Sequence, residues 1–214
     1  MSAPLRLVVL GDSVTAGSVA TDLRSDELYV HHLQQEFQRS YCPIELIPSA
    51  LDGVDTGYAL KRFDRMVAVH HPDVVCIMLG LNDFHPPGRR QPISPEEYDQ
   101  NLRQLIGRIL EIKAQPILAT PTPRLNATGV LNDAEEAGFC DLMCDYVNAA
   151  ISVAENCSLR LIDAYSPFFR LGNLRRLIPD GIHPGPQGHK VIAQAFADLL
   201  IPFCNRAASQ GIIV

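Results

Sequence analysis

The chain lacks the features that define several classes of protein. None of its apolar runs approaches the roughly 20 residues of a membrane-spanning helix, and it contains no internal repeat, low-complexity tract or linker. It has no excess of basic residues: the net charge is −6, with acidic and basic side chains interspersed. We therefore expect neither a membrane span nor a surface for nucleic acid.

The sequence also lacks a metal-binding or disulfide pattern. Its six cysteines are scattered, with no C-x-x-C pair, so we expect reduced thiols in a cytoplasmic protein and neither a metal nor a cofactor. A zinc site or a disulfide framework is the alternative. Residues 1–4 lead directly into an apolar segment without a basic-then-apolar leader, so no secretory signal is expected.

What is present is typical of a globular domain. The 214 residues, 47% of them apolar and 20% charged, fit one domain over residues 1–214 that buries a sizeable core. Apolar segments of strand type alternate with segments of helical period. This alternation predicts an α/β fold with a parallel, doubly wound sheet. The five expected strands are residues 5–10, 44–47, 74–79, 116–119 and 159–162.

One expected helix illustrates the pattern. Ser94 is suited to cap it, Pro95 to occupy its first position, and Glu97 to complete a capping box. An apolar stripe of helical spacing follows, and we expect all its members to be buried. The stripe consists of Leu102, Leu105, Ile106, Ile109 and Leu110.

Three segments that follow expected strands carry residues suited to chemistry. Residues 11–17, 52–57 and 80–84 should meet at one crevice, because ligands of open α/β sheets bind beyond the carboxyl ends of the strands. The backbone N–H groups of Ser13 and Gly53 and the side-chain amide of Asn82 could supply three hydrogen-bond donors to a developing oxyanion. Gly53 and Asn82 could instead serve only the backbone conformation of their loops.

Serine, histidine and aspartate together can turn a neutral hydroxyl into a nucleophile. Ser13 stands directly after the first strand, and His183 stands three positions after Asp180, before the last helix. We expect Ser13 to attack, His183 to take its proton, and Asp180 to hold the imidazole in the useful tautomer. Taken singly, each residue also fits an ordinary turn or surface position.

Four blocks of the sequence resemble those of the SGNH hydrolases, also called GDSL-type esterases and lipases. They are residues 11–13 (Gly-Asp-Ser), the surroundings of Gly53, residues 80–83 (Gly-Leu-Asn-Asp) and residues 180–183 (Asp-Gly-Ile-His). Valine follows the serine where leucine is common, and an asparagine often found before the glycine is absent. The resemblance implies a flavodoxin-like, three-layer α/β/α fold with a five-stranded, mainly parallel sheet. It assigns Ser13, Asp180 and His183 to catalysis and Ser13, Gly53 and Asn82 to the oxyanion hole.

The expected function is hydrolysis of small-molecule carboxylic esters without metal or cofactor. Thioesters and acetylated sugars remain possible substrates, and the oligomeric state is open. The alternatives are an acyltransferase with the same triad and a flavodoxin-like binding module without chemistry. A phosphate site at residues 11–17 is disfavoured, because the lysine of a P-loop and the G-x-G-x-x-G spacing are missing.

The remaining polar residues receive structural interpretations. Asp12 and Asp83 are expected to stabilise their loops, and the histidine pairs at residues 31–32 and 70–71 to lie on the solvated surface. His85, just after the Asn82 block, is a candidate for substrate contact. The loop arginines Arg89 and Arg90 are candidates for binding an anionic group.

Overall fold

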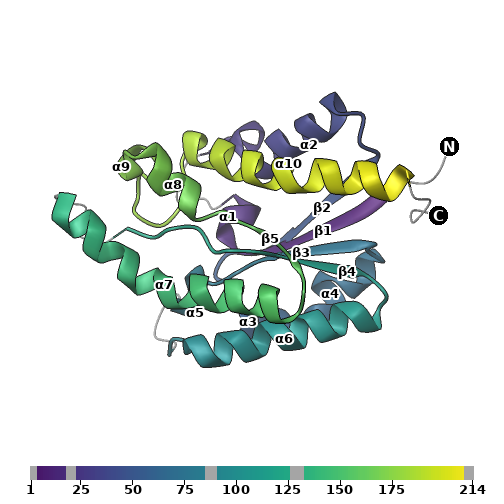
Figure 1. Ribbon diagram of the computed structural model, residues 1–214, viewed down its shortest axis with the longest axis horizontal. Helices are drawn as coiled ribbons and strands as arrows, with labels where there is room; N and C mark the ends of the chain where they lie inside the picture. Colours follow the sequence, from purple (N-terminus) through teal and green to yellow (C-terminus); the bar gives the residue numbers. More distant parts are fainter. Residues whose placement is uncertain (1–3, 18–22, 85–90, 126–132, 210–214) are drawn as a thin grey trace.

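The computed structural model describes residues 4–17, 23–84, 91–125 and 133–209. Within them, strands alternate with helices along the whole chain (Figure 1). The strands are β1 (Leu5–Gly11), β2 (Ile44–Ala50), β3 (Val74–Met78), β4 (Gln115–Ala119) and β5 (Arg160–Ile162). The helices are α1 (Ser13–Ala16), η2 (Ser25–Glu27), α2 (Tyr29–Arg39), α3 (Thr56–Lys61), α4 (Phe63–Met66), η3 (Ala68–His70), α5 (Leu81–Phe84), α6 (Pro95–Glu111), α7 (Asp133–Asn156), α8 (Ser166–Leu171), α9 (Leu174–Leu177) and α10 (Pro186–Ser209).

The five strands form one parallel sheet in the order β2-β1-β3-β4-β5. Helices α2 and α10 lie on one face of the sheet, and α3, α6 and α7 lie on the other (Figure 1). The three-layer α/β/α architecture predicted from the sequence is therefore confirmed. All five strands point the same way, so the loops that follow them gather at one edge of the sheet.

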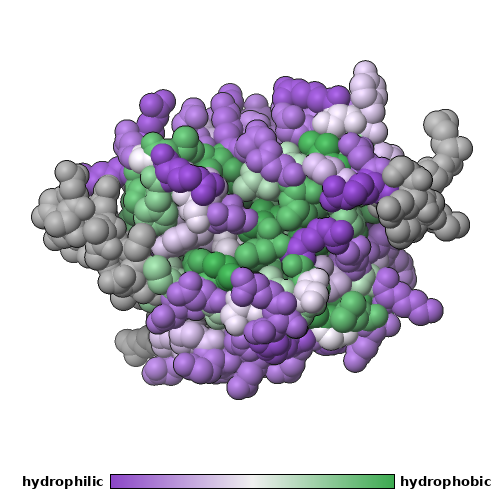
Figure 2. All heavy atoms as spheres, in the orientation of Figure 1, coloured by the Kyte–Doolittle hydropathy of each residue, from purple (hydrophilic) through white to green (hydrophobic). Residues whose placement is uncertain are grey.

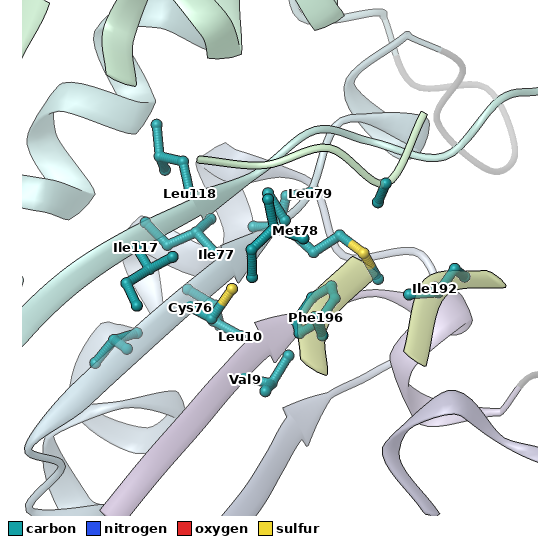
Figure 3. Close-up of a cluster of buried hydrophobic side chains, with 14 of the residues drawn as sticks. Val9, Leu10, Cys76, Ile77, Met78, Leu79, Ile117, Leu118, Ile192 and Phe196 are labelled. Atoms are coloured by element: carbon teal, nitrogen blue, oxygen red, sulfur yellow. The ribbon is translucent and has the colours of Figure 1, made fainter. Parts of the chain in front are cut away.

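The central strands are apolar throughout because helices cover both of their faces. All five residues of β3 are buried, and six of the seven residues of β1 are buried. Figure 3 shows side chains of both strands, among them Leu10 and Ile77, gathered in one cluster with Phe196 of α10. Burying this many large apolar side chains supplies the main driving force for folding.

Helix α6 begins where the sequence predicted it. The Ser94 hydroxyl accepts a hydrogen bond from the Glu97 backbone N–H at 3.2 Å, and Pro95 occupies the first helical position. The predicted stripe is buried except at one residue: Leu110 is 56% exposed. The prediction for Leu110 was wrong because the face of α6 in contact with the sheet and α7 is narrower than the stripe drawn from spacing alone.

Helices α2 and α10 come from opposite ends of the chain and pack against each other. Tyr29 of α2 packs against Phe196 of α10, with their ring centroids 5.2 Å apart. Both side chains are fully buried, as are Leu33 and Phe37 on the same face of α2. This contact between the first and last long helices brings the segment before α10 close to the end of β1.

The distribution of polar and apolar side chains on the surface reflects the three layers. In Figure 2 polar side chains cover the outer helices, and apolar side chains form a band across the middle of this face, between the two helix layers. Within the described ranges no helix combines the length and the apolar character that crossing a membrane requires. Among the described residues, Cys42, Cys76, Cys157 and Cys204 are free thiols.

Candidate active site

Ser13 is the first residue of α1, at the point where β1 ends. The Asp12 carboxylate caps this short helix by accepting a hydrogen bond from the Val14 backbone N–H at 3.0 Å. The chain turns so tightly that a Cβ atom at Gly11 would lie 2.1 Å from the Thr15 hydroxyl oxygen, so glycine is required there. The turn holds Ser13 at the carboxyl edge of the sheet with 8% of its surface exposed.

The structure brings Ser13, His183 and Asp180 together. Ser13 Oγ lies 3.0 Å from His183 Nε2, although 170 positions separate them in the chain. His183 Nδ1 lies 2.7 Å from Asp180 Oδ2. In this arrangement the imidazole can take a proton from the serine while its other ring N–H donates to the carboxylate.

The loop that holds His183 is built around Asp180. Asp180 Oδ1 accepts hydrogen bonds from the backbone N–H groups of Ile182, at 2.8 Å, and His183, at 2.6 Å. Partial burial opposes ionisation of Asp180, but the hydrogen bonds from the His183 ring and from the two backbone groups outweigh it. The pKa of Asp180 is therefore below its ordinary value, and the carboxylate stays charged beside the imidazole.

Gly53 lies on the loop after β2 and Asn82 lies on the short helix α5, and hydrogen bonds join these two segments. Asn82 Nδ2 donates to the Val54 carbonyl oxygen at 3.0 Å. Asp83 accepts hydrogen bonds from both the backbone N–H and the hydroxyl of Thr56. Gly53 itself has φ +75°, a left-handed conformation that favours glycine.

Donors remain available at this corner of the sheet. Among the described residues, the backbone N–H groups of Ser13 and Gly53 have no hydrogen-bond acceptor. The Asn82 amide has two N–H bonds, of which the contact with Val54 uses one. Asn82 therefore braces the neighbouring loop that carries Gly53, in line with the alternative interpretation, and still has one N–H to donate.

Comparison with known proteins identifies the family. The model of the GDSL-like lipase/acylhydrolase family matches residues 9–191. The chain belongs to this family. It is therefore an esterase/acylhydrolase of the GDSL type, as the four sequence blocks predicted.

Individual proteins similar to this GDSL-type hydrolase match along most of its length. A GDSL esterase/lipase of Arabidopsis thaliana is 28% identical over 219 residues, covering 91% of this chain and 85% of that protein. An acetylxylan esterase of Geobacillus stearothermophilus is 24% identical, covering 89% and 91%. The crystal structure of an α/β hydrolase enzyme from the metagenome of Lake Arreo, Spain, superposes with a TM-score of 0.75 at 28% identity, covering 95% and 97%.

Two buried carboxyl groups lie beneath the site of the hydrolase. Burial raises the pKa of Asp12 to about 7, and nearby Asp83 adds to the effect. Burial likewise raises the pKa of Asp83 to about 7, against the hydrogen bonds from Thr56. Both residues stabilise their segments, as the sequence analysis expected, and both have almost no exposure to solvent that would stabilise their charge.

These carboxyl groups predict an unusual dependence of stability on pH. The folded protein binds their protons more tightly than the unfolded chain, in which an aspartate has a pKa near 3.8. The free energy of unfolding should therefore fall as pH rises from about 4 through about 7. We expect this fall to be smaller in Asp83→Asn than in the wild type when urea unfolding is measured at pH 5 and pH 8.

A matched variant controls for general charge effects. Asp26→Asn removes a carboxylate from an exposed position on η2 and should keep the slope of the wild type. Asp83→Asn also changes the hydrogen bonds with Thr56. The free energies of unfolding at the two pH values are therefore compared within each variant. If the free energy of unfolding fell equally between pH 5 and pH 8 in Asp83→Asn and the wild type, the raised pKa of Asp83 would not be the cause.

The sequence analysis missed His189, which is 1% exposed in the first turns of α10. Its Nδ1 accepts a hydrogen bond from the Tyr29 backbone N–H at 3.1 Å, and burial lowers its pKa to about 4. The signal was present: His189 precedes Ile192 and Phe196 by three and seven positions, which places it on the buried stripe of the helix.

The other residues named from sequence have mixed outcomes. His31 and His71 are exposed as expected, but His32 and His70 are half-buried, and His32 Nε2 has no hydrogen-bond partner among the described residues. His85, Arg89 and Arg90 lie outside the described residues. Within the described parts of the chain, no group of three or more His, Cys, Asp or Glu side chains is arranged to hold a metal ion.

Proposed function

We propose that this GDSL-type hydrolase cleaves carboxylic esters with Ser13 as the nucleophile, His183 as the general base and Asp180 as the residue that orients the imidazole. One observation carries the proposal: a continuous series of contacts links Ser13 Oγ to His183 Nε2 at 3.0 Å and His183 Nδ1 to Asp180 Oδ2 at 2.7 Å. These distances are within the range in which an imidazole activates a hydroxyl.

The reaction has two halves. As Ser13 Oγ attacks the ester carbonyl carbon, its proton passes to His183 Nε2, and Asp180 stabilises the imidazolium that forms. His183 then gives the proton to the departing alkoxide, so the alcohol leaves and an acyl-serine remains. In the second half His183 takes a proton from water, the resulting hydroxide attacks the acyl-serine, and the proton returns to Ser13 as the acid is released.

The negative charge that develops on the carbonyl oxygen needs donors fixed before the reaction begins. The backbone N–H groups of Ser13 and Gly53, which have no acceptor among the described residues, and the second N–H of Asn82 suit this role. The hydrogen bonds that Thr56 donates to Asp83 tie the segment after Gly53 to α5, which bears Asn82, so two of the donors are held in one rigid unit. This arrangement supports the oxyanion hole expected from the sequence.

We expect esters with acyl groups of short to moderate length. The sequence has no insertion that would serve as a lid and no extra apolar segment for a deep lipid tunnel. A relative that matches most of the chain is named an acetylxylan esterase, and an acetyl ester has a short acyl group. Thioesters of similar size are the next class to examine.

A covalent probe tests the proposal directly. A fluorophosphonate should label the wild-type enzyme, and intact-mass measurement should find one adduct, located by peptide mapping at Ser13. The Ser13→Ala protein should remain unlabelled. Labelling that persists in Ser13→Ala, or a wild type that hydrolyses no ester or thioester in a panel of graded chain length, would rule out this mechanism.

The role of Asn82 predicts a slower but intact enzyme. Asn82→Ala removes an oxyanion donor and should lower kcat by about 100-fold or more, with a smaller change in KM. Because it also removes the bond to the Val54 carbonyl, thermal unfolding should be measured alongside. Asn82→Asp is the companion variant: it can no longer donate, and a carboxylate there would repel the oxyanion. A kcat near that of the wild type for either variant would exclude Asn82 from the oxyanion hole.

A further inference from the structure

Arg124 lies at the same edge of the sheet as the proposed catalytic residues. It stands in the segment that follows β4, and its guanidinium carbon is 5.8 Å from the centre of the Phe84 ring. Phe84 comes two residues after Asn82. On the other side, the backbone N–H of Leu125 donates to the Gly181 carbonyl oxygen at 2.5 Å. Arg124 is therefore placed between α5, which bears Asn82, and the loop that holds His183.

The guanidinium of Arg124 is half-buried, with no polar partner in the part of the chain that the structure describes. Among the described residues, no carboxylate lies within ion-pair distance of it and no acceptor is hydrogen-bonded to it. The Asp180 carboxylate is near enough to favour its charge, while burial lowers the pKa of the guanidinium below its ordinary value. An arginine keeps its proton under such conditions, so a positive charge with unused donors stays partly withdrawn from water.

Both carboxylate oxygens of Asp180 already have hydrogen-bond partners. Its two oxygens accept hydrogen bonds from the backbone N–H groups of Ile182 and His183 and from the His183 ring. An arginine whose purpose was to hold Asp180 would be expected to form a direct ion pair with it, and Arg124 does not. The five N–H bonds of a guanidinium instead match a carboxylate supplied from outside, which two of them can bind side by side.

We propose that Arg124 is a specificity residue that binds a carboxylate on the substrate, so that the preferred substrates are monoesters that carry a second, free carboxylate. The inference rests on the proposed function, because it places the ester beside Ser13 and the free carboxylate against Arg124. It also answers an electrostatic problem: without a cation nearby, the charged Asp180 carboxylate would repel an anionic substrate.

Matched esters test the proposal and show which end of the substrate bears the charge. On the acyl side, mono-4-nitrophenyl glutarate is compared with 4-nitrophenyl pentanoate, its neutral counterpart. On the leaving-group side, 4-acetoxybenzoate is compared with its methyl ester. For each pair the measured quantity is the ratio of kcat/KM for the charged ester to kcat/KM for the neutral one. The ratio cancels effects that act on both substrates equally.

The expected result is a loss of selectivity confined to one pair. In Arg124→Met that pair's ratio should fall tenfold or more, as the loss of a hydrogen-bonded charge pair implies. In Arg124→Lys it should fall less, because an ammonium keeps the charge without the paired donors. Arg65→Met is the matched control: Arg65 is exposed on α4, so the same loss of charge there should leave both ratios unchanged.

Two outcomes would overturn the inference while the proposed function stands. If both members of each pair slow equally in Arg124→Met, the residue acts on Asp180 or on the fold. If neither the ratios nor the individual kcat/KM values change, Arg124 does not contact the substrate. A binding measurement separates the inference from catalysis: calorimetry on Ser13→Ala protein, with monomethyl glutarate if the acyl-side pair responds or 4-acetoxybenzoate if the leaving-group pair responds, should detect binding that Arg124→Met abolishes. Equal binding in both proteins would refute the carboxylate site, and a wild type inactive on every ester would refute the proposed function.

Discussion

Replacing Ser13 with alanine is expected to lower kcat for ester hydrolysis by about a millionfold. The change removes one oxygen atom, and with it both the attacking group and the partner of His183 Nε2. The oxyanion donors and the substrate crevice would remain, so a residual rate above that of water is expected. The effect on the fold should be small, because the Ser13 hydroxyl is bonded to His183 and lies at the start of a four-residue helix.

Single-turnover and steady-state kinetics with a chromogenic ester measure this loss. Ser152→Ala, on the exposed face of α7, is the matched control because it makes the same chemical change away from the site. The control should keep the kcat of the wild type, and all three proteins should share a near-ultraviolet circular dichroism spectrum. If Ser13→Ala retains more than about one-hundredth of the wild-type kcat, another nucleophile performs the reaction.

Asp180→Asn should have the second-largest effect, a loss of about 10⁴-fold in kcat. The amide oxygen of asparagine can still accept the backbone hydrogen bonds from Ile182 and His183 that hold the loop. Its NH₂ group, however, would face His183 Nδ1, and a donor there favours the tautomer whose proton sits on Nε2. That tautomer cannot accept the proton of Ser13, so the loop keeps its shape while the base is disabled.

Asp163→Asn provides a close control for this prediction. Asp163 Oδ1 accepts hydrogen bonds from the backbone N–H groups of Tyr165 and Ser166, so it holds a turn much as Asp180 does, but it has no bond to His183. Kinetics and thermal unfolding should show both variants folded and only Asp180→Asn slow. A kcat within tenfold of the wild type for Asp180→Asn would mean that His183 is oriented by another group.

Secondary structure was predictable where local patterns suffice. The apolar segments of β1 and β3 and the Ser94-Pro95 start of α6 are encoded within a few neighbouring residues. The exposure of individual side chains was harder to predict. Leu110 fits the helical spacing of its neighbours, yet it is exposed, because spacing does not say how wide a face the neighbouring elements cover.

The residues proposed for chemistry divide in the same way. Ser13, Asp180 and His183 were named from sequence blocks, and the fold places their side chains within hydrogen-bonding distance; their catalytic roles remain predictions. Arg124 and His189 belong to no block. Their importance depends on what packs around them, which is the Phe84 ring in one case and the backbone of Tyr29 in the other.

By itself the sequence determined the family, the alternation of strands and helices, and the identity of the reactive side chains, because those properties reside in short segments and their order. Only the tertiary structure decided which groups meet. The parallel sheet brings loops from distant parts of the chain to one edge, and burial there raises the pKa of Asp12 and Asp83 and leaves the guanidinium of Arg124 half-buried. Burial and electrostatic environment depend on contacts between remote residues, and no local pattern records them.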